Sequence, residues 1–235
     1  MGVRRSSIVL ATAFSAAVLW AAGPGAPLAG AQPAGGLCQL TGVANLSPPL
    51  TGTSQSFAYN FTGTLGTGAM GSCQSNVAGA PTTGTVSAGI QLPETVTLTN
   101  TSTGATTSGT VLYQEPIPQG SGSCGSSTTS GEALAAWGDG NNTVIDYTTT
   151  GALAAVQLQG TVAASMTLTL VASSVPAGYT APATYIVSSN DPAFAVGEQS
   201  AALLTFSPTT PDQNCETVGV SSANINGVVG IGRVP

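Results

Sequence analysis

The sequence predicts an all-β protein, an antiparallel β-sandwich or barrel-like fold of about ten strands held by two disulfides. Small and β-branched residues dominate its composition, which suits strands and turns better than helices. Apolar and polar residues alternate over several segments, and turn sequences separate these segments at short intervals. No window has a convincing helical period, so we expect strands throughout.

The first clear strand covers residues 57–65, where aromatic and aliphatic residues share one face and mostly polar residues form the other. The residues of the apolar face are Phe57, Tyr59, Phe61 and Leu65. This alternation is typical of a half-buried strand. Residues 94–100 repeat the pattern, because Val96 and Leu98 alternate with threonines.

The longest alternating run covers the fifteen residues 156–170, with apolar residues at the even positions and mostly polar residues at the odd ones. This run exceeds the usual strand length of about five or six residues. We therefore predict a bend near Gly160 or at Ala163–Ala164. Two further alternating strands are predicted at residues 202–206 and 225–231.

Turn signals rich in Gly, Pro, Asn and Ser separate the predicted strands. They are Ser47-Pro48-Pro49, Gly66-Thr67-Gly68, Asn100–Gly104 and Gly138–Asn142. No segment with the composition of a linker interrupts residues 32–235. The sequence therefore predicts a single sandwich or barrel domain over residues 32–235.

Residues 1–31 have the features of a secretory signal peptide. Arg4 and Arg5 precede the short apolar run Ser7–Ala22, and Ala29-Gly30-Ala31 supplies an A-x-A cleavage site. The run is short for a bilayer span of about 20 residues, and no second hydrophobic span follows. We therefore expect a secreted protein, extracellular or at the cell surface, with no stable membrane span after signal removal.

The predicted mature chain is strongly acidic. The sequence contains no Lys and no His, and Arg233 is the only arginine outside residues 1–31. Nine Asp and Glu residues minus one arginine give this part of the chain a net charge of −8. Such a chain cannot neutralise phosphates, which excludes nucleic acid as a partner and disfavours anionic membrane surfaces.

Four cysteines in an exported chain predict two disulfides, for which three pairings exist. We favour Cys38–Cys73 and Cys124–Cys215. The first pair connects the earliest strands, and the second connects the middle of the chain to its C-terminal region. Each bridge is expected to contribute about 2–4 kcal/mol, mainly by restricting the unfolded chain.

The missing residue types exclude several chemistries. Without His or Lys the chain has no Ser-His-Asp triad, no Cys-His dyad and no Schiff-base lysine. Cys124 and Ser123 lie in a Ser- and Gly-rich loop that lacks both the G-x-S-x-G spacing and a neighbouring base. The sequence predicts no cofactor-binding motif and no metal centre. The missing residue types therefore favour a non-enzymatic protein.

Residues 139–143 offer an alternative, a calcium site. Asp139, Asn141 and Thr143 have plausible oxygen ligands, but Val144 stands where an EF-hand loop requires glycine.

Acidic and aromatic residues concentrate between Glu132 and Tyr147. Glu132, Asp139 and Asp146 suit a carboxylate-based glycoside hydrolase, with Trp137 and Tyr147 as platforms for sugar stacking. A simpler interpretation is a β-hairpin in which Trp137 anchors the core. Trp137, Asp139 and Tyr147 are the candidate ligand contacts.

Several cysteine and turn motifs, spread over most of the predicted mature chain, resemble those of a known group of proteins. The motifs are Cys38-Gln-Leu-Thr-Gly, Phe57-Ala-Tyr-Asn-Phe-Thr-Gly, Ser72-Cys73-Gln-Ser, Gly-Ser-Cys124-Gly, Ala136-Trp137-Gly-Asp-Gly, Asp146-Tyr147-Thr and Gly227-Val-Val-Gly. The chain resembles small secreted disulfide-containing β-proteins of high-GC Gram-positive bacteria with no assigned activity. The resemblance implies an extracellular β-fold and assigns no catalytic residue.

The leading hypothesis is a secreted, non-enzymatic binding or cell-surface protein. Its unknown ligand or surface partner is a glycan, a small apolar molecule or another protein. The alternatives are a carboxylate-based extracellular glycoside hydrolase and a structural component of the envelope or matrix.

Overall fold

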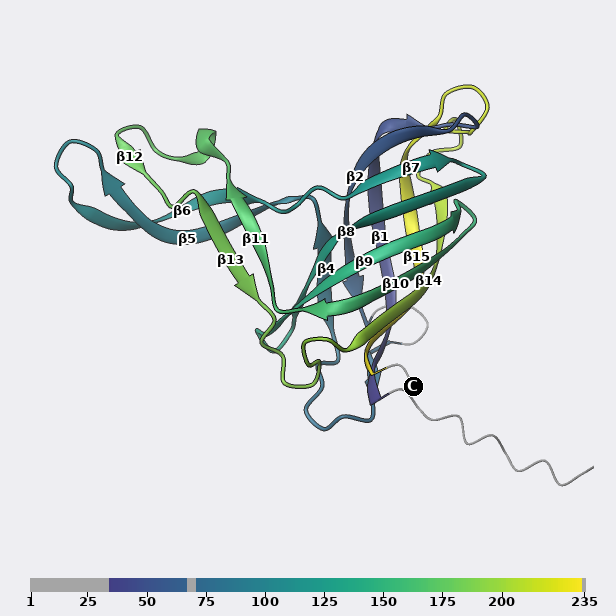
Figure 1. The fold of residues 1–235 in the computed structure, drawn as a ribbon, viewed down its shortest axis with the longest axis horizontal. Coiled ribbons are helices and arrows are strands. Elements are labelled where there is room, and N and C mark those ends of the chain that lie inside the picture. Colours follow the sequence, from purple (N-terminus) through teal and green to yellow (C-terminus); the bar gives the residue numbers. More distant parts are fainter. Residues whose placement is uncertain (1–33, 67–70, 234–235) are drawn as a thin grey trace, which may run out of the picture. The chain divides into compact units, whose positions relative to one another are not determined.

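The computed structural model of the protein describes residues 34–66 and 71–233 (Figure 1). Over these residues the chain forms fifteen β-strands and one short 3-10 helix, η1 (Ala172–Ser174). The prediction of an all-β protein is therefore confirmed. The number of strands exceeds the predicted ten because several are too short to show alternation. The predicted signal peptide, residues 1–31, lies outside the described residues.

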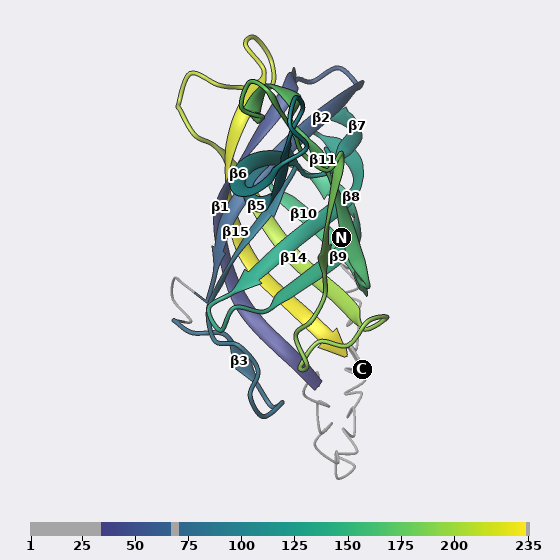
Figure 2. The same cartoon turned by 90° about the vertical axis from the view of Figure 1, so that its left-hand side faces the viewer.

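Eight antiparallel strands close into a barrel, which decides between the two predicted architectures. Around the barrel the order is β1, β15, β14, β10, β9, β8, β4 and β2, and β2 pairs again with β1. Figure 2 shows the tilt of β1, β14 and β15 in the barrel wall. The strands are β1 (Ala34–Leu50), β2 (Gln55–Leu65), β4 (Gly84–Ala88), β8 (Ser126–Trp137), β9 (Asn142–Ala152), β10 (Ala155–Ala163), β14 (Gln199–Pro208) and β15 (Val220–Arg233).

Two short strands share one place in the wall, between β2 and β8. β4 pairs with one end of each neighbour, and β7 (Gln119–Ser123) pairs with the other end. The two-residue strand β3 (Gln74–Ser75) pairs with β1 at Gly36 and Leu37, beyond the part of β1 that pairs with β2.

The barrel closes where β1 pairs with β2, from Leu40 opposite Leu65 to Ser47 opposite Ala58. Gly42 lies directly opposite Gly63 in this pairing. A Cβ at Gly42 would collide with the backbone oxygen of Thr62 across the seam. The glycine pair thus allows the two strands to approach closely.

A second sheet is built from two excursions of the chain out of the barrel. One excursion leaves between β4 and β7, and the other leaves between β10 and β14. The buried side chains of this sheet pack in one cluster with Leu134 and Val144 of the barrel wall. In sheet order the strands are β12 (Tyr179–Thr180), β5 (Gln91–Asn100), β6 (Thr106–Gln114), β11 (Ser165–Leu170) and β13 (Thr184–Ser188).

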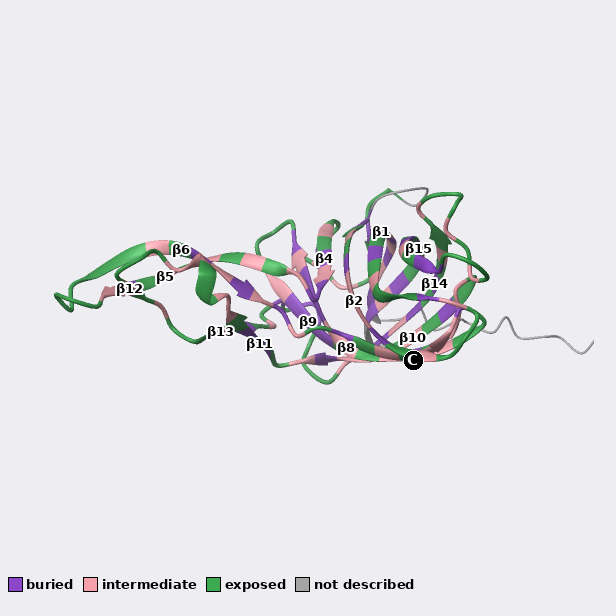
Figure 3. Cartoon of the chain, turned by 90° about the horizontal axis from the view of Figure 1, so that it is seen from above, coloured by how far each residue is buried: buried purple, intermediate pink, exposed green. Residues whose placement is uncertain are grey.

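Alternation along the barrel strands separates the interior from the outer surface (Figure 3). On β14, Ser200, Ala202 and Leu204 are buried, whereas Leu203 between them is 65% exposed. The predicted bend in the run 156–170 is confirmed, because the chain bends at Ala164 between β10 and β11.

Both predicted disulfides are confirmed, with Cα–Cα distances of 4.3 Å for Cys38–Cys73 and 6.0 Å for Cys124–Cys215. Cys124 lies in the turn between β7 and β8, and Cys215 lies in the loop between β14 and β15. The second bridge therefore joins two loops at one end of the barrel. At the opposite end, the Trp137 ring packs against Phe194, with ring centroids 5.3 Å apart.

We predict that removing the second disulfide destabilises the fold more than removing the first. The bridge Cys124–Cys215 spans 91 residues and Cys38–Cys73 spans 35, so the longer loop restricts the unfolded chain more. Paired Cys→Ala substitutions are expected to lower the free energy of unfolding by about 2–4 kcal/mol, with the larger loss at Cys124 and Cys215. Urea denaturation measures both losses, and a reversed order would contradict the prediction.

Candidate functional site

The three predicted ligand contacts lie in three different environments. Trp137 is buried at 4% exposure, and its indole N–H donates a 2.9 Å hydrogen bond to the hydroxyl of Thr143. Asp139 is exposed in the hairpin turn, where its carboxylate accepts hydrogen bonds from the backbone and side chain of Asn141. Tyr147 is also buried, but it faces a cavity inside the barrel. The structure therefore does not bring these residues together on one surface.

The oxygen ligands of the calcium alternative do not assemble. Thr143 is fully buried and its hydroxyl accepts the Trp137 N–H, whereas Asp139 is exposed. No cluster of three or more potential His, Cys, Asp or Glu ligands occurs in residues 34–66 and 71–233.

Two of the three predicted acids lie side by side on the outside of the barrel. Glu132 on β8 is directly opposite Asp146 on β9. Partial burial, together with the neighbouring carboxyl of Asp146 and a hydrogen bond to it, raises the pKa of Glu132. Ser130, Thr148 and other polar residues line the groove around them. Glycosidases use two carboxyl groups, so this pair is where the hydrolase alternative would have its catalytic acids.

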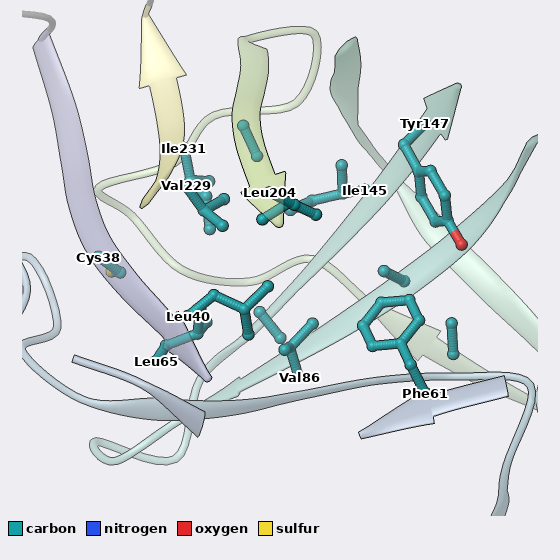
Figure 4. Packing of buried hydrophobic residues seen from close by; sticks show 14 of the residues in the cluster. Cys38, Leu40, Phe61, Leu65, Val86, Ile145, Tyr147, Leu204, Val229 and Ile231 are labelled. Atoms are coloured by element: carbon teal, nitrogen blue, oxygen red, sulfur yellow. The ribbon is translucent and has the colours of Figure 1, made fainter. Parts of the chain in front are cut away.

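The main cavity of about 70 Å³ lies inside the barrel. It exists because several inward positions carry small residues, among them Ala44, Ala133, Ala135 and Ser200. Figure 4 shows larger side chains around this region of the core, including Phe61 with Tyr147 and Leu204 with Ile231. The remaining lining residues are Leu40, Tyr59, Leu65, Val86, Ile145, Thr149, Leu158, Phe206, Ile225 and Val229.

A second cavity of about 60 Å³ adjoins the first, toward the end of the barrel that carries Cys124–Cys215. Four residues line both cavities, namely Ala44, Tyr59, Thr149 and Phe206. The second cavity is otherwise lined by Leu46, Leu50, Phe57, Ser127, Thr129, Leu153 and Val156. No lining residue of either cavity carries a charge.

Four hydroxyl groups form a chain of hydrogen bonds across the interior. The Tyr147 and Tyr59 hydroxyls are 2.7 Å apart, and the Tyr59 and Thr129 hydroxyls are 2.9 Å apart. Thr129 continues to Thr149 at 2.7 Å. Burial raises the pKa of Tyr59 and raises that of Tyr147 well above its usual value, so both phenols are neutral.

Ser200 carries a further hydroxyl inside the barrel, and it differs from these four. It is 2% exposed and lines the main cavity, and its Oγ has no hydrogen-bond partner. A buried hydroxyl without a partner costs about 1–3 kcal/mol. Its position marks a point in an apolar cavity where a polar atom of a ligand would be stabilised.

Sequence analysis did not identify Tyr59 or Ser200 as site residues. The sequence could have indicated Tyr59, because it is the one hydroxyl-bearing residue on a strand face of Phe and Leu. The sequence could also have indicated Ser200, because extending the alternation of Ala202 and Leu204 back by two residues places Ser200 on the same strand face.

Comparisons with protein-family models, curated proteins and solved structures found no match for this chain. A separate search of the described residues found no helix of the length and apolar character needed to cross a membrane.

Glu115 is a buried acid outside the cavity, at 1% exposure. Its carboxylate accepts hydrogen bonds from the Ser87 hydroxyl at 2.6 Å and from the Ile90 N–H at 3.0 Å. Burial raises the pKa of Glu115, and these two hydrogen bonds oppose that effect. Burial also raises the pKa of Asp191.

We predict that the protein becomes more stable as the solution is mildly acidified. The folded-state pKa values of Glu115, Glu132 and Asp191 are raised, so each group stabilises the fold below its unfolded pKa. That contribution is lost as the pH rises through the folded pKa. The free energy of unfolding should therefore increase from about pH 7 to about pH 5.

Urea denaturation at several pH values measures this trend. Glu115→Gln should remove part of it, because the amide does not titrate. A loss of stability over the same range would contradict the prediction.

Proposed function

We propose that the protein binds a small, neutral, mostly apolar molecule inside the barrel. The observation that carries this proposal is the unpartnered hydroxyl of Ser200, 2% exposed, in the wall of an otherwise largely apolar cavity. An eight-stranded barrel has an interior wide enough to be filled by side chains or to hold one small ligand. Pockets of this type use a few polar groups to orient an apolar ligand.

Two energetic terms support the proposal. A cavity of about 70 Å³ costs roughly 2 kcal/mol at about 24 cal/mol per Å³. The unpartnered Ser200 hydroxyl adds about 1–3 kcal/mol. A ligand that fills the cavity and hydrogen-bonds to Ser200 would recover part of both terms.

We also propose that the protein acts outside the cell. Two disulfides are typical of proteins from oxidising compartments. Residues 1–31 have the sequence pattern of a signal peptide, which supports export.

We predict that Ser200→Ala weakens binding while leaving the fold intact. Losing one hydrogen bond of about 1 kcal/mol should lower the affinity for ethanol, an alcohol small enough for the cavity, about fivefold. The free energy of unfolding should stay constant or rise by about 1 kcal/mol, because a buried unpartnered hydroxyl is removed. Calorimetric titration and urea denaturation measure the two effects. Unchanged affinity in a folded variant would argue against the site.

We also predict that filling the cavity prevents binding. Ala135 is fully buried in the cavity wall, so Ala135→Leu places three more carbons in the cavity and should lower ethanol affinity at least about tenfold. Ala201→Leu makes the same change on the outer face of β14 and serves as the matched control. Equal affinities of the two variants would contradict an interior site.

The hydrolase alternative depends on different residues. It requires Glu132 and Asp146, which lie outside the barrel, so Glu132→Gln should abolish any turnover of polysaccharide. The same substitution should leave ethanol binding unchanged. This variant therefore separates the two functions.

A further inference from the structure

The second sheet has two open edges within the described residues. One edge is formed by β5 and β12, and the other is formed by β13, which lies beside β11 (Figure 1). An open edge presents unpaired backbone N–H and C=O groups to any strand that can add to it. The residues of each edge strand therefore decide whether the edge can accept a partner.

The edge at β5 carries features that prevent pairing. β12 already pairs with its last two residues, Thr99 and Asn100. The Asn100 N–H bonds to Ala105 O, so even-numbered residues of β5 bond to β6 and odd-numbered residues face the edge. Pro93 is one of the residues that face the edge, and it has no N–H to offer there. Glu94 adds a charge to the strand, which further disfavours pairing.

The edge at β13 has none of these features. Its sequence, Thr184-Tyr185-Ile186-Val187-Ser188, contains no charge, proline or glycine. β13 pairs with β11 without a bulge, and no other strand pairs with it in the part of the chain that the structure describes. Aromatic and β-branched residues favour strand pairing. β13 is thus an edge strand that is open to a partner.

The unpaired backbone groups of β13 belong to Thr184, Ile186 and Ser188. The Ser189 N–H bonds to Ala164 O at 2.9 Å, so odd-numbered residues on this side of the sheet bond to β11. The even-numbered residues therefore direct their N–H and C=O groups outward. All three are exposed, and the apolar side chain of Ile186 is 62% exposed.

Two copies of β13 match each other when they pair antiparallel about Ile186. Ile186 then lies opposite the partner subunit's Ile186, and Thr184 lies opposite the partner subunit's Ser188. On the other face of the strand, Tyr185 lies opposite the partner subunit's Val187. Hydroxyl pairs and aromatic–β-branched pairs of this kind stabilise neighbouring strands. The outward backbone groups would form about six hydrogen bonds across the new pair.

The antiparallel arrangement also keeps the two barrels apart. The chain leaves β13 at Ser189, whose hydroxyl accepts a hydrogen bond from the Val144 N–H of β9 and donates one to Ala163 O of β10. Each barrel therefore lies beyond the Ser188 end of its own β13. In an antiparallel pair these two ends point in opposite directions, whereas parallel pairing would bring both barrels to the same end.

Charge restricts which surfaces of two copies can meet. Nine carboxylates and one arginine give residues 32–235 a net charge of −8, so two copies repel each other. β13 has no charged residue, so pairing through it places no two carboxylates directly opposite each other. Once both copies of β13 are paired, the joined sheet has only its β5 edges left. Association should therefore stop at a dimer.

We propose that the protein forms a two-fold symmetric dimer through β13, in which the second sheets of two copies join edge to edge. This dimer does not depend on the cavity or on its ligand. Five residues per copy bury less than the roughly 800 Å² per partner of a standard interface. The dimer is therefore weak, with an expected dissociation constant of about 10–100 μM.

Sedimentation equilibrium of the purified protein, from about 1 μM to about 1 mM, tests this proposal. The mass should change from that of a monomer to that of a dimer over this range. A monomeric mass at every concentration would overturn the dimer, whether or not the cavity binds ethanol. A mass that rises beyond the dimer would overturn the two-fold closed arrangement.

A charge at the centre of the pair should separate the two copies. Ile186→Lys places two like charges opposite each other and should weaken the dimer at least about tenfold. Thr167→Lys adds the same charge at the exposed residue of β11 that lies opposite Ile186, one strand away from the edge, and is the matched control. Equal dissociation constants of the two variants would overturn pairing through β13.

Cross-linking provides a second measurement that also reports the register. Opposite residues of a hydrogen-bonded pair have Cα atoms about 5.5 Å apart, which a disulfide can span. The four native cysteines are already paired, so Ile186→Cys supplies a single free thiol per chain. Mild oxidation should convert this variant to a covalent dimer.

Thr184→Cys is the matched control for the cross-link. Antiparallel pairing about Ile186 keeps the two copies of residue 184 about 13 Å apart, too far for a disulfide. This variant should therefore give far less covalent dimer than Ile186→Cys. An equal or higher yield from Thr184→Cys would overturn the antiparallel register.

Discussion

The pairing of β1 with β2 is the interaction on which the rest of the structure depends, because it closes the barrel. Gly42 and Gly63 lie opposite each other in this seam, and a side chain at Gly42 would collide with the opposite backbone. Closure converts two strand edges into a continuous hydrogen-bonded wall. It also encloses the inward side chains, so both the apolar core and the cavity follow from it. A chain without Lys or His has few ion pairs with which to replace these contributions.

Inside this wall, four buried hydroxyl groups have hydrogen-bond partners and the Ser200 hydroxyl has none. The Tyr147, Tyr59, Thr129 and Thr149 hydroxyls bond to one another, so their burial is compensated. Ser200 has no such partner. The same hydrogen bonds fix the ring of Tyr59, which is one of the four side chains that line both cavities. The interior therefore satisfies most of its hydroxyl groups and leaves the Ser200 hydroxyl available to a ligand.

Local patterns in the sequence predicted much of the architecture. The shared face of Phe57 and Leu65 and a bend within residues 156–170 followed from alternation and strand length. Cysteine number predicted two disulfides and left three pairings, of which the structure has the favoured one. The additional strands of the two sheets were not all predicted. Strands of two residues, such as β3 and β12, are formed by pairing with distant segments and leave no period in the sequence.

By itself, the sequence determined that the chain is all-β, acidic and cross-linked, and which residues share a strand face. It did not determine whether Trp137 and Tyr147 lie in the core or on the surface, because an aromatic side chain with a polar group suits both positions. Trp137 and Tyr147 were therefore candidates for a surface platform, whereas the closed barrel turns both inward. Only the tertiary structure placed Ser200 beside residues from distant strands, since an enclosed cavity is formed by long-range pairing.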